Sequence, residues 1–274
     1  MPSSTSRPTS AARPARHLLA KTAAVGAAAV LCATAMTGSA GAIVNGKDST
    51  ERYPFMASIP MTVFDAQCGA SLIHPQWVIT AGHCVDESVG SIPTGEVRIG
   101  SEKRKSGGTV RSIAKVVTHP GYGIVGEAAR SSDDLALVKL DRPVAQKPIR
   151  IAQKTGPVGT PTRILGWGKS DDSDQWVFPE RLQQLDTRRA AASDCTSRIN
   201  AKTELCTVSR VPNAMACKGD SGGPQIKRVG GRWELIGATS GDGDNDPRCS
   251  TGPGIYTNVL VYKDWIAKTI AKHR

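Results

Sequence analysis

The sequence predicts an all-β protein, a sandwich or a barrel, that ends in one helix. Short apolar or alternating runs recur after about residue 43, separated by clusters of Gly, Pro, Asp and Ser. This spacing is typical of many short strands joined by turns. Helical periodicity is found only at the end, where Tyr262, Trp265, Ile266 and Ile270 fall on one face. We expect this helix over about residues 260–272.

Each expected strand is a short apolar or alternating run bounded by turn-forming residues. In chain order the runs are Ser71–Ile73, Trp77–Thr80, Glu96–Ile99, Val110–Val117, Leu135–Leu140, Arg163–Gly166, Trp233–Thr239 and Gly254–Val259. No repeat or low-complexity segment interrupts them.

Residues 1–42 have a different character and predict a secretory signal peptide. They carry four basic and no acidic side chains, then an Ala/Val-rich run over about residues 22–36, then Ser39-Ala40-Gly41-Ala42. The apolar run is too short and too rich in Ala for a membrane span. Lipoprotein processing at Cys32 fits poorly with the residues before it. We therefore expect a secreted, extracellular protein, and the long basic start is typical of bacterial leaders.

The chain is basic, with a formal net charge of +11. Positive charge can serve nucleic-acid binding, but the basic residues are scattered and aromatic residues make up only 4% of the chain. A solvated basic surface is the better interpretation. We expect no nucleic-acid partner.

A reactive serine is indicated by residues 217–224, which read CKGDSGGP. Serine is a poor nucleophile without a base, and the flanking glycines allow a sharp turn whose N–H groups can approach a carbonyl. The string alone could be an ordinary turn. However, TAGHC at residues 80–84 and DLAL at residues 134–137 supply a base and an orienting acid, in the order His, Asp, Ser.

Together with their flanks, these segments resemble the chymotrypsin/trypsin family of serine endopeptidases. Further landmarks in the family order are Ile43-Val44-Asn45-Gly46, CGASLI at 68–73, Trp77–Thr80, Gly166-Trp167-Gly168 and Pro253–Tyr256. The resemblance runs from Ile43 to the C-terminus. It implies two antiparallel six-stranded β-barrels with the active site in the cleft between them. The first would cover about residues 43–145 and the second about 155–258, within a protease domain of residues 43–274.

The resemblance also assigns roles to the motif residues. His83 would be the general base, suited by an ordinary pKa of about 6.5. Asp134, rather than its neighbour Asp133, would orient His83. Ser221 would be the nucleophile, with the N–H groups of Gly219 and Ser221 forming the oxyanion hole.

An activation pair is implied between Asp220 and the α-amino group of Ile43. Because Ala40-Gly41-Ala42 precedes Ile43 directly, signal cleavage alone would generate that terminus. The histidine that stabilises family zymogens is replaced here by Ala66. We therefore expect an enzyme that is active on export. The competing interpretation is cleavage after Ala35, which leaves a short activation peptide.

The substrate pocket departs from the trypsin pattern. The resemblance places Met215, Ser240 and Gly254 in the pocket for the residue before the scissile bond (P1). Trypsin-like members carry Asp at the position of Met215, so the apolar floor predicts a bulky apolar P1 residue rather than Arg or Lys.

The segment after Ser240 is also unusual. Gly241 stands where the family has an aromatic residue, and Asp242 follows. An insertion then adds Asp244 and Asp246, which form either an exposed acidic loop or an acidic pocket rim.

Outside the leader six cysteines remain, which suits an exported protein. Spacing alone leaves many pairings open. The resemblance implies Cys68–Cys84, Cys195–Cys206 and Cys217–Cys249.

No metal or cofactor motif is present, and we expect neither. The expected partners are protein or peptide substrates and protein protease inhibitors. We expect a monomer, free of the membrane after signal cleavage. The alternative function is a non-catalytic binding homologue on the same scaffold.

Overall fold

The computed structural model describes residues 43–125 and 130–274. The expected signal peptide, residues 1–42, lies outside them. No helix in the described part is long and apolar enough to cross a membrane.

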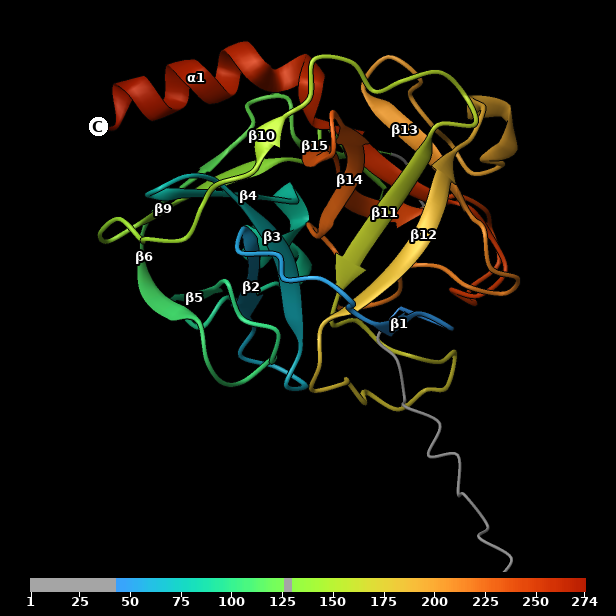
Figure 1. The fold of residues 1–274 in the computed structure, drawn as a ribbon, viewed down its shortest axis with the longest axis horizontal. Helices are drawn as coiled ribbons and strands as arrows, with labels where there is room; N and C mark the ends of the chain where they lie inside the picture. Colours follow the sequence, from blue (N-terminus) through green and yellow to red (C-terminus); the bar gives the residue numbers. More distant parts are fainter. Residues whose placement is uncertain (1–42, 126–129) are drawn as a thin grey trace, which may run out of the picture. The chain divides into compact units, whose positions relative to one another are not determined.

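The first β-barrel is built from six antiparallel strands and closes in the order β2-β3-β4-β9-β6-β5 (Figure 1). The strands are β2 (Met56–Pro60), β3 (Gln67–His74), β4 (Trp77–Thr80), β5 (Glu96–Ile99), β6 (Thr109–Thr118) and β9 (Ala136–Leu140). Their interior is apolar: Met56, Leu72, Ile79, Ile99 and Leu137 are fully buried. Burial of these side chains is the main force that closes the barrel.

The second barrel is a ring of six antiparallel strands, in which β12 pairs with both β11 and β13. The strands are β11 (Pro161–Gly166), β12 (Gln183–Arg189), β13 (Glu204–Ser209), β14 (Pro224–Val229), β15 (Arg232–Asp242) and β16 (Gly254–Asn258). Two short strands extend the ring. β1 (Lys47–Asp48) pairs with β12, and β10 (Arg150–Ile151) pairs in parallel with β15.

The remaining elements are short. β7 (Gly123–Val125) and β8 (Arg130–Ser132) pair with each other. The 3-10 helices are η1 (Gly82–Val85), η2 (Glu87–Val89), η3 (Ala192–Asp194) and η4 (Val259–Tyr262), and the last leads into α1 (Lys263–Lys272). The two six-stranded barrels and the C-terminal helix confirm the predicted fold class.

Unlike the first barrel, the second contains buried polar side chains that bond to one another. The Gln225 amide donates to Thr207 Oγ1 at 2.8 Å, and the hydroxyls of Thr162 and Thr187 lie 2.6 Å apart. These hydrogen bonds offset much of the desolvation penalty of burying the polar groups, although Gln225 Oε1 itself has no partner among the described residues.

Glu51 fixes the N-terminal segment to the second barrel. Its carboxylate accepts two hydrogen bonds from Arg228, at 2.7 and 2.9 Å, one from Arg163 at 3.0 Å and one from the Trp233 indole at 3.0 Å. The same two guanidinium groups lie 4.3 and 5.0 Å from the centre of the Trp233 ring. These bonds fix the position of the segment that follows Ile43, the residue expected to form the activation pair.

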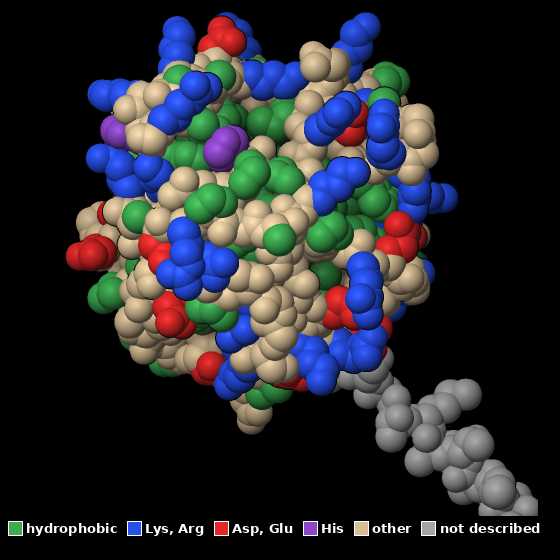
Figure 2. All heavy atoms as spheres, turned by 60° about the vertical axis from the view of Figure 1, so that its left-hand side comes forward, with side chains coloured by type: hydrophobic (Ala, Val, Ile, Leu, Met, Phe, Trp, Pro, Cys, Tyr) green, Lys and Arg blue, Asp and Glu red, His purple; other side chains and the backbone are tan. Residues whose placement is uncertain are grey.

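Basic side chains are spread over the face shown in Figure 2, with acidic side chains between them. This distribution agrees with a solvated basic surface.

Candidate active site

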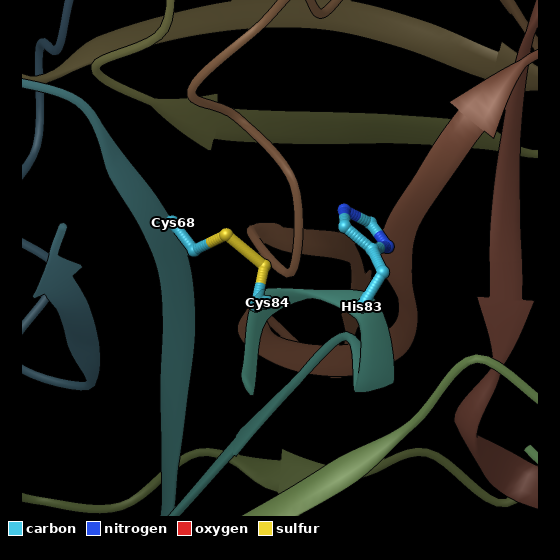
Figure 3. Close-up of side chains that lie close together, drawn as sticks. All are labelled: Cys68, His83 and Cys84. Atoms are coloured by element: carbon cyan, nitrogen blue, oxygen red, sulfur yellow. A yellow bond between two sulfur atoms is a disulfide. The ribbon is translucent and has the colours of Figure 1, made fainter. Parts of the chain in front are cut away.

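His83 lies on η1, directly after β4. The disulfide Cys68–Cys84 joins β3 to the residue that follows His83 (Figure 3). A second constraint comes from Asp134, whose Oδ1 accepts a hydrogen bond from the His83 backbone N–H at 2.9 Å. The backbone of His83 is therefore held from both sides.

The imidazole of His83 contacts Asp134, with 2.8 Å between Nδ1 and Oδ2. An ionised carboxylate only accepts hydrogen bonds, so Nδ1 carries the proton and Nε2 keeps a free lone pair. Burial by itself lowers the pKa of His83, but the charge and hydrogen bond of Asp134 outweigh it and raise the pKa above its usual value. The ring is therefore prepared to accept a proton at Nε2.

Asp134 is buried and binds three donors. Besides the two groups of His83, the Ser240 hydroxyl donates to Oδ2 at 2.6 Å. Burial alone raises the pKa of Asp134, but His83 and the hydrogen bond of Ser240 outweigh it and hold the pKa below its usual value. The group stays ionised beside His83.

The neighbouring Asp133 is directed elsewhere. Its backbone has a φ of +44°, and its carboxylate accepts a hydrogen bond from the Tyr262 hydroxyl at 2.5 Å. Of the two adjacent acids, Asp134 is thus the one in contact with His83.

Ser221 lies in a tight turn that contacts both barrels. Its carbonyl accepts a hydrogen bond from Gly69 of β3 at 2.7 Å, and the next N–H, of Gly222, donates to Thr239 of β15 at 2.7 Å. Gly222 has a φ of +75°, and a Cβ there would lie 2.1 Å from Thr80 Oγ1. Only glycine allows this close approach between the turn and β4.

These contacts bring the three predicted residues to one place. The turn of Ser221 lies against Thr80, three residues before His83, and it bonds to Thr239, the neighbour of Ser240. His83 and Asp134 are in direct contact, while no hydrogen bond joins the Ser221 hydroxyl to His83 among the described residues. Catalytic hydrogen bonds of this kind often form only when substrate is bound.

Within residues 219–223, two backbone N–H groups are unpaired in the described chain. The N–H groups of Asp220, Gly222 and Gly223 each donate to a carbonyl, whereas those of Gly219 and Ser221 have no acceptor in the described chain. Gly219 has a φ of +97°. These two groups are the pair predicted for the oxyanion hole.

Asp220 is buried without a cationic partner among residues 43–125 and 130–274. Its oxygens accept hydrogen bonds from the backbone N–H groups of Gly168, at 2.8 Å, and Cys217, at 2.9 Å. Burial raises the pKa of Asp220 to about 7 despite these bonds.

Ile43 lies in the same region of the protein as Asp220. Its side chain is fully buried in a cluster with Met215 and Tyr256, and burial, together with the charge of Asp220, raises the pKa of Tyr256. The N–H of Val44 donates to the carbonyl of Met215 at 3.0 Å. No direct hydrogen bond joins Ile43 to Asp220 in the described chain, where the nitrogen of Ile43 is still a peptide amide.

A pocket of about 260 Å³ opens beside Ser221. Met215 and Gly254 both line it, and a Cβ at Gly254 would lie 3.2 Å from Met215 Sδ. Ser240, the third residue predicted for this pocket, does not line it and instead directs its hydroxyl to Asp134.

The pocket wall contains one acid that sequence reasoning did not assign to it. Asp242 lines the pocket, and burial raises the pKa of its carboxyl. Asp244 and Asp246 do not line it, and Asp246 is paired with Arg248 at 2.7 Å. Asp244 and Asp246 therefore belong to an acidic loop outside the pocket, and the acid in the pocket wall is Asp242.

All three predicted disulfides are present: Cys68–Cys84, Cys195–Cys206 and Cys217–Cys249. Two groups of side chains in the described residues have the spacing of possible metal ligands, one that includes His83 and one that includes Asp172. Each group contains both sulfurs of a disulfide, and these cannot act as thiolate ligands.

Comparison with known proteins gives matches over nearly the whole described chain. Residues 43–266 match the family model described as Trypsin. The chain is 30% identical to a mouse (Mus musculus) protein named tryptase over 252 residues, which cover 84% of this chain and 89% of that protein. It is 31% identical to human (Homo sapiens) kallikrein-5 over 240 residues, covering 85% and 78%.

A solved structure of neuropsin, described as a serine protease expressed in the limbic system of mouse brain, matches with a TM-score of 0.70 and 27% identity. The match covers 83% of this chain and all of that one. These relatives are mammalian, so they lend no support to the bacterial origin suggested by the leader.

Proposed function

Because this chain belongs to the trypsin family of serine endopeptidases, whose substrates are proteins or peptides, we propose that His83, Asp134 and Ser221 are its catalytic triad. The observation that carries this proposal is the 2.8 Å contact between His83 and the buried Asp134, beside a serine turn with two unpaired N–H groups.

In the first step, Ser221 Oγ attacks the carbonyl carbon of the scissile peptide bond. Its proton passes to Nε2 of His83, and the electron pair of the carbonyl moves onto its oxygen. Asp134 stabilises the imidazolium through Nδ1 without taking the proton itself. The N–H groups of Gly219 and Ser221 bind the developing oxyanion, and each such donor contributes about 10²–10³ in rate.

When the tetrahedral intermediate collapses, the C–N bond breaks and His83 gives its proton to the leaving amine. The product is an ester between Ser221 and the acyl half of the substrate. Water then repeats the sequence, with His83 again as base, and releases the acid. Each proton taken by His83 is returned, so the enzyme ends unchanged.

Activation fits the burial of Asp220. Cleavage before Ile43 would create an ammonium group next to the cluster of Met215 and Tyr256, and Asp220 is a buried acid that has no cationic partner among the described residues. The pair would fix the turn that carries Gly219 and Ser221. Signal cleavage after Ala42 would produce it directly, and N-terminal sequencing of the freshly secreted protein tests this. A start upstream of Ile43 would support the short activation peptide instead.

The preferred P1 residue is bulky and apolar. Support comes from Met215, which gives the pocket an apolar floor, and from Gly254, which leaves room beside it. Asp242 on the wall favours the opposite outcome, a basic residue. Peptides that differ only at P1 decide between them: cleavage after Leu or Phe supports the apolar preference, and cleavage after Arg alone would reverse it.

Residues 1–42 direct secretion in this proposal, and residues 43–274 act as an extracellular monomeric protease domain. Protein protease inhibitors would bind the same cleft as substrates. Gel filtration of the secreted protein tests the monomer.

Covalent labelling tests the triad. An organophosphate should modify Ser221 in the processed enzyme, and His83→Ala should abolish the reaction. Ser88→Ala, which removes a serine hydroxyl that is bonded to Asp86, is the matched control and should be labelled normally. If the processed enzyme is not labelled, the non-catalytic binding homologue becomes the better interpretation.

A further inference from the structure

A second pocket, of about 280 Å³, lies apart from the candidate active site. None of the residues that line it also lines the pocket beside Ser221. Three segments meet there: the chain before β2, the segment that leads into β10, and the hairpin of β14 and β15. We call it the basic pocket, and its lining residues fall within 51–55, 147–150 and 228–234.

The base of the basic pocket is apolar. Phe55 and Ile149 line it and are almost fully buried, at 6% and 4% exposed. Pro54, Pro148 and the partly exposed Trp233 complete the apolar lining. A concave apolar lining with polar groups around it is the usual composition of a ligand site.

Trp233 is held in place before any ligand arrives. Its indole N–H donates to Glu51 at 3.0 Å, and the guanidinium groups of Arg228 and Arg163 lie 4.3 and 5.0 Å from the centre of its ring. Both guanidinium groups also bond to Glu51. A ligand that packs on this ring therefore does not have to order it, which removes part of the entropic cost of binding.

Positive charge predominates around the apolar base. Five cationic and two acidic side chains line the pocket: Arg52, Lys147, Arg150, Arg228 and Arg232 against Glu51 and Glu234. Arg228 and Glu51 neutralise each other at 2.7 Å. Lys147, Arg150 and Arg232 are exposed and have no ion-pair partner among residues 43–125 and 130–274. The excess positive charge attracts an anionic ligand.

The two properties together narrow the class of ligand. A sulfated sugar or a free phosphate would use the cations but leave the apolar base empty, and an uncharged apolar compound would do the reverse. A peptide segment with a bulky apolar residue between carboxylates uses both. The pocket is accessible to such a segment, since the Arg52 side chain beside it is 90% exposed.

We propose that the basic pocket binds an acidic segment of a separate protein, with a bulky apolar residue entering the pocket between Asp or Glu side chains. The apolar residue packs on Trp233 and Ile149, and its acidic neighbours pair with Lys147, Arg150 and Arg232. This site does not use Ser221, so the proposal stands or falls separately from the proposed protease activity.

The test measures binding of labelled peptides by fluorescence anisotropy. The protein carries Ser221→Ala so that no peptide is cleaved. The probe has the sequence DEFED, with a dye at its start and an amide at its end. We expect a Kd on the order of 10–100 µM. The peptide DEAED should bind about tenfold more weakly, because it lacks the apolar side chain, and KKFKK should not bind.

Charge reversal of the argument is tested on the protein side. Lys147→Ala/Arg232→Ala should weaken DEFED binding about fivefold, and raising the salt from about 50 to about 500 mM should affect this variant less than its parent. Lys202→Ala/Lys268→Ala removes two exposed cations outside the pocket and is the matched control. It should bind DEFED as the parent does. Both variants should keep the parent's urea midpoint, because all four side chains are exposed.

Four results would overturn the proposal. Unchanged affinity in Lys147→Ala/Arg232→Ala would place the peptide elsewhere, for instance in the pocket beside Ser221. An equal loss in the control variant would show that only the net charge of the protein matters. Equal affinity for DEFED and DEAED would show that the apolar base is not used. A heparin-derived tetrasaccharide that binds more tightly than DEFED, and loses more affinity in Lys147→Ala/Arg232→Ala, would make the site one for polysaccharides.

Discussion

Replacing Asp220 by Asn should change how the stability of the uncleaved chain depends on pH. In that chain the carboxyl is buried without a cation among the described residues, and its pKa is raised from 3.8 to about 7. A group whose folded pKa is raised contributes stability that is fully present below its unfolded pKa. That stability is lost as the pH rises through the folded value. The ionised form of Asp220 therefore destabilises the uncleaved fold above about pH 7.

The size of the effect follows from the two pKa values. A difference of roughly three pH units corresponds to about 4 kcal/mol, and roughly 2–3 kcal/mol of it falls between pH 5 and pH 8. An Asn amide nitrogen cannot accept the N–H of Gly168 or Cys217, which costs about 1–3 kcal/mol at either pH. The readout is therefore the change in unfolding free energy with pH, which this constant penalty leaves unaffected.

The assay is urea unfolding followed by tryptophan fluorescence at pH 5 and pH 8. The chain keeps Gly41-Ala42 before Ile43, and Ser221→Ala prevents self-cleavage. This chain should lose roughly 2–3 kcal/mol more than its Asp220→Asn form between the two pH values. A form that starts at Ile43 should lose much less, because its terminal ammonium neutralises Asp220.

Equal pH dependence in the uncleaved chain with and without Asp220→Asn would refute this reasoning, since another group would then control the transition. If the form that starts at Ile43 behaved like the uncleaved chain, the activation pair would be wrong, although the burial argument would stand.

Three further substitutions test other contacts. Ser240→Ala removes a hydrogen bond to the ionised Asp134, worth about 1.5–3 kcal/mol, so kcat should fall about tenfold or more; Ser88→Ala, at an exposed Ser–Asp contact, should leave kcat unchanged. Glu51→Gln should lower the unfolding free energy by about 1–2 kcal/mol, discounted for partial exposure, and the loss should shrink in high salt. Gly222→Ala should cost more than about 3 kcal/mol or prevent folding, which soluble yield and the urea midpoint would show.

The predicted runs correspond to five of the six strands of the first barrel, whose interior is apolar, but leave out β2. The runs Trp77–Thr80 and Glu96–Ile99 coincide with β4 and β5. The apolar pattern fails on β12, where Gln183, Gln184 and Thr187 are buried. A strand with polar residues on both its inner and its outer face shows no apolar alternation. The hydrogen-bond partners that lower the cost of burying the inner polar side chains come from other strands, so the strand's own sequence does not reveal them.

The contact of His83 with Asp134 could be anticipated from the motifs, but the direction of Ser240 could not. The pairing of β15 with β16 shifts register between Thr239 and Gly241, so Ser240 lies at an irregularity of the strand. Such an irregularity redirects a side chain, here away from the pocket and toward Asp134. Simple strand alternation carries no signal for this.

The stacking of Phe64 on Trp176 had no signal in the sequence either. Phe64 and Trp176 lie in two irregular loops, 112 positions apart in the chain, and loops have no periodicity from which a shared surface could be deduced. Their stacking depends on how β3 and β12 bring those loops together.

Both barrels hold the serine turn, and this has a consequence for catalysis. The carbonyl of Ser221 bonds to Gly69 of the first barrel, whereas Asp220 bonds to Gly168 and Gly222 to Thr239, both of the second barrel. The unpaired N–H groups of Gly219 and Ser221 lie between these anchors. Because an oxyanion donor works only within a few tenths of an ångström of its position, any substitution that shifts one barrel against the other should lower kcat even when it is far from the cleft.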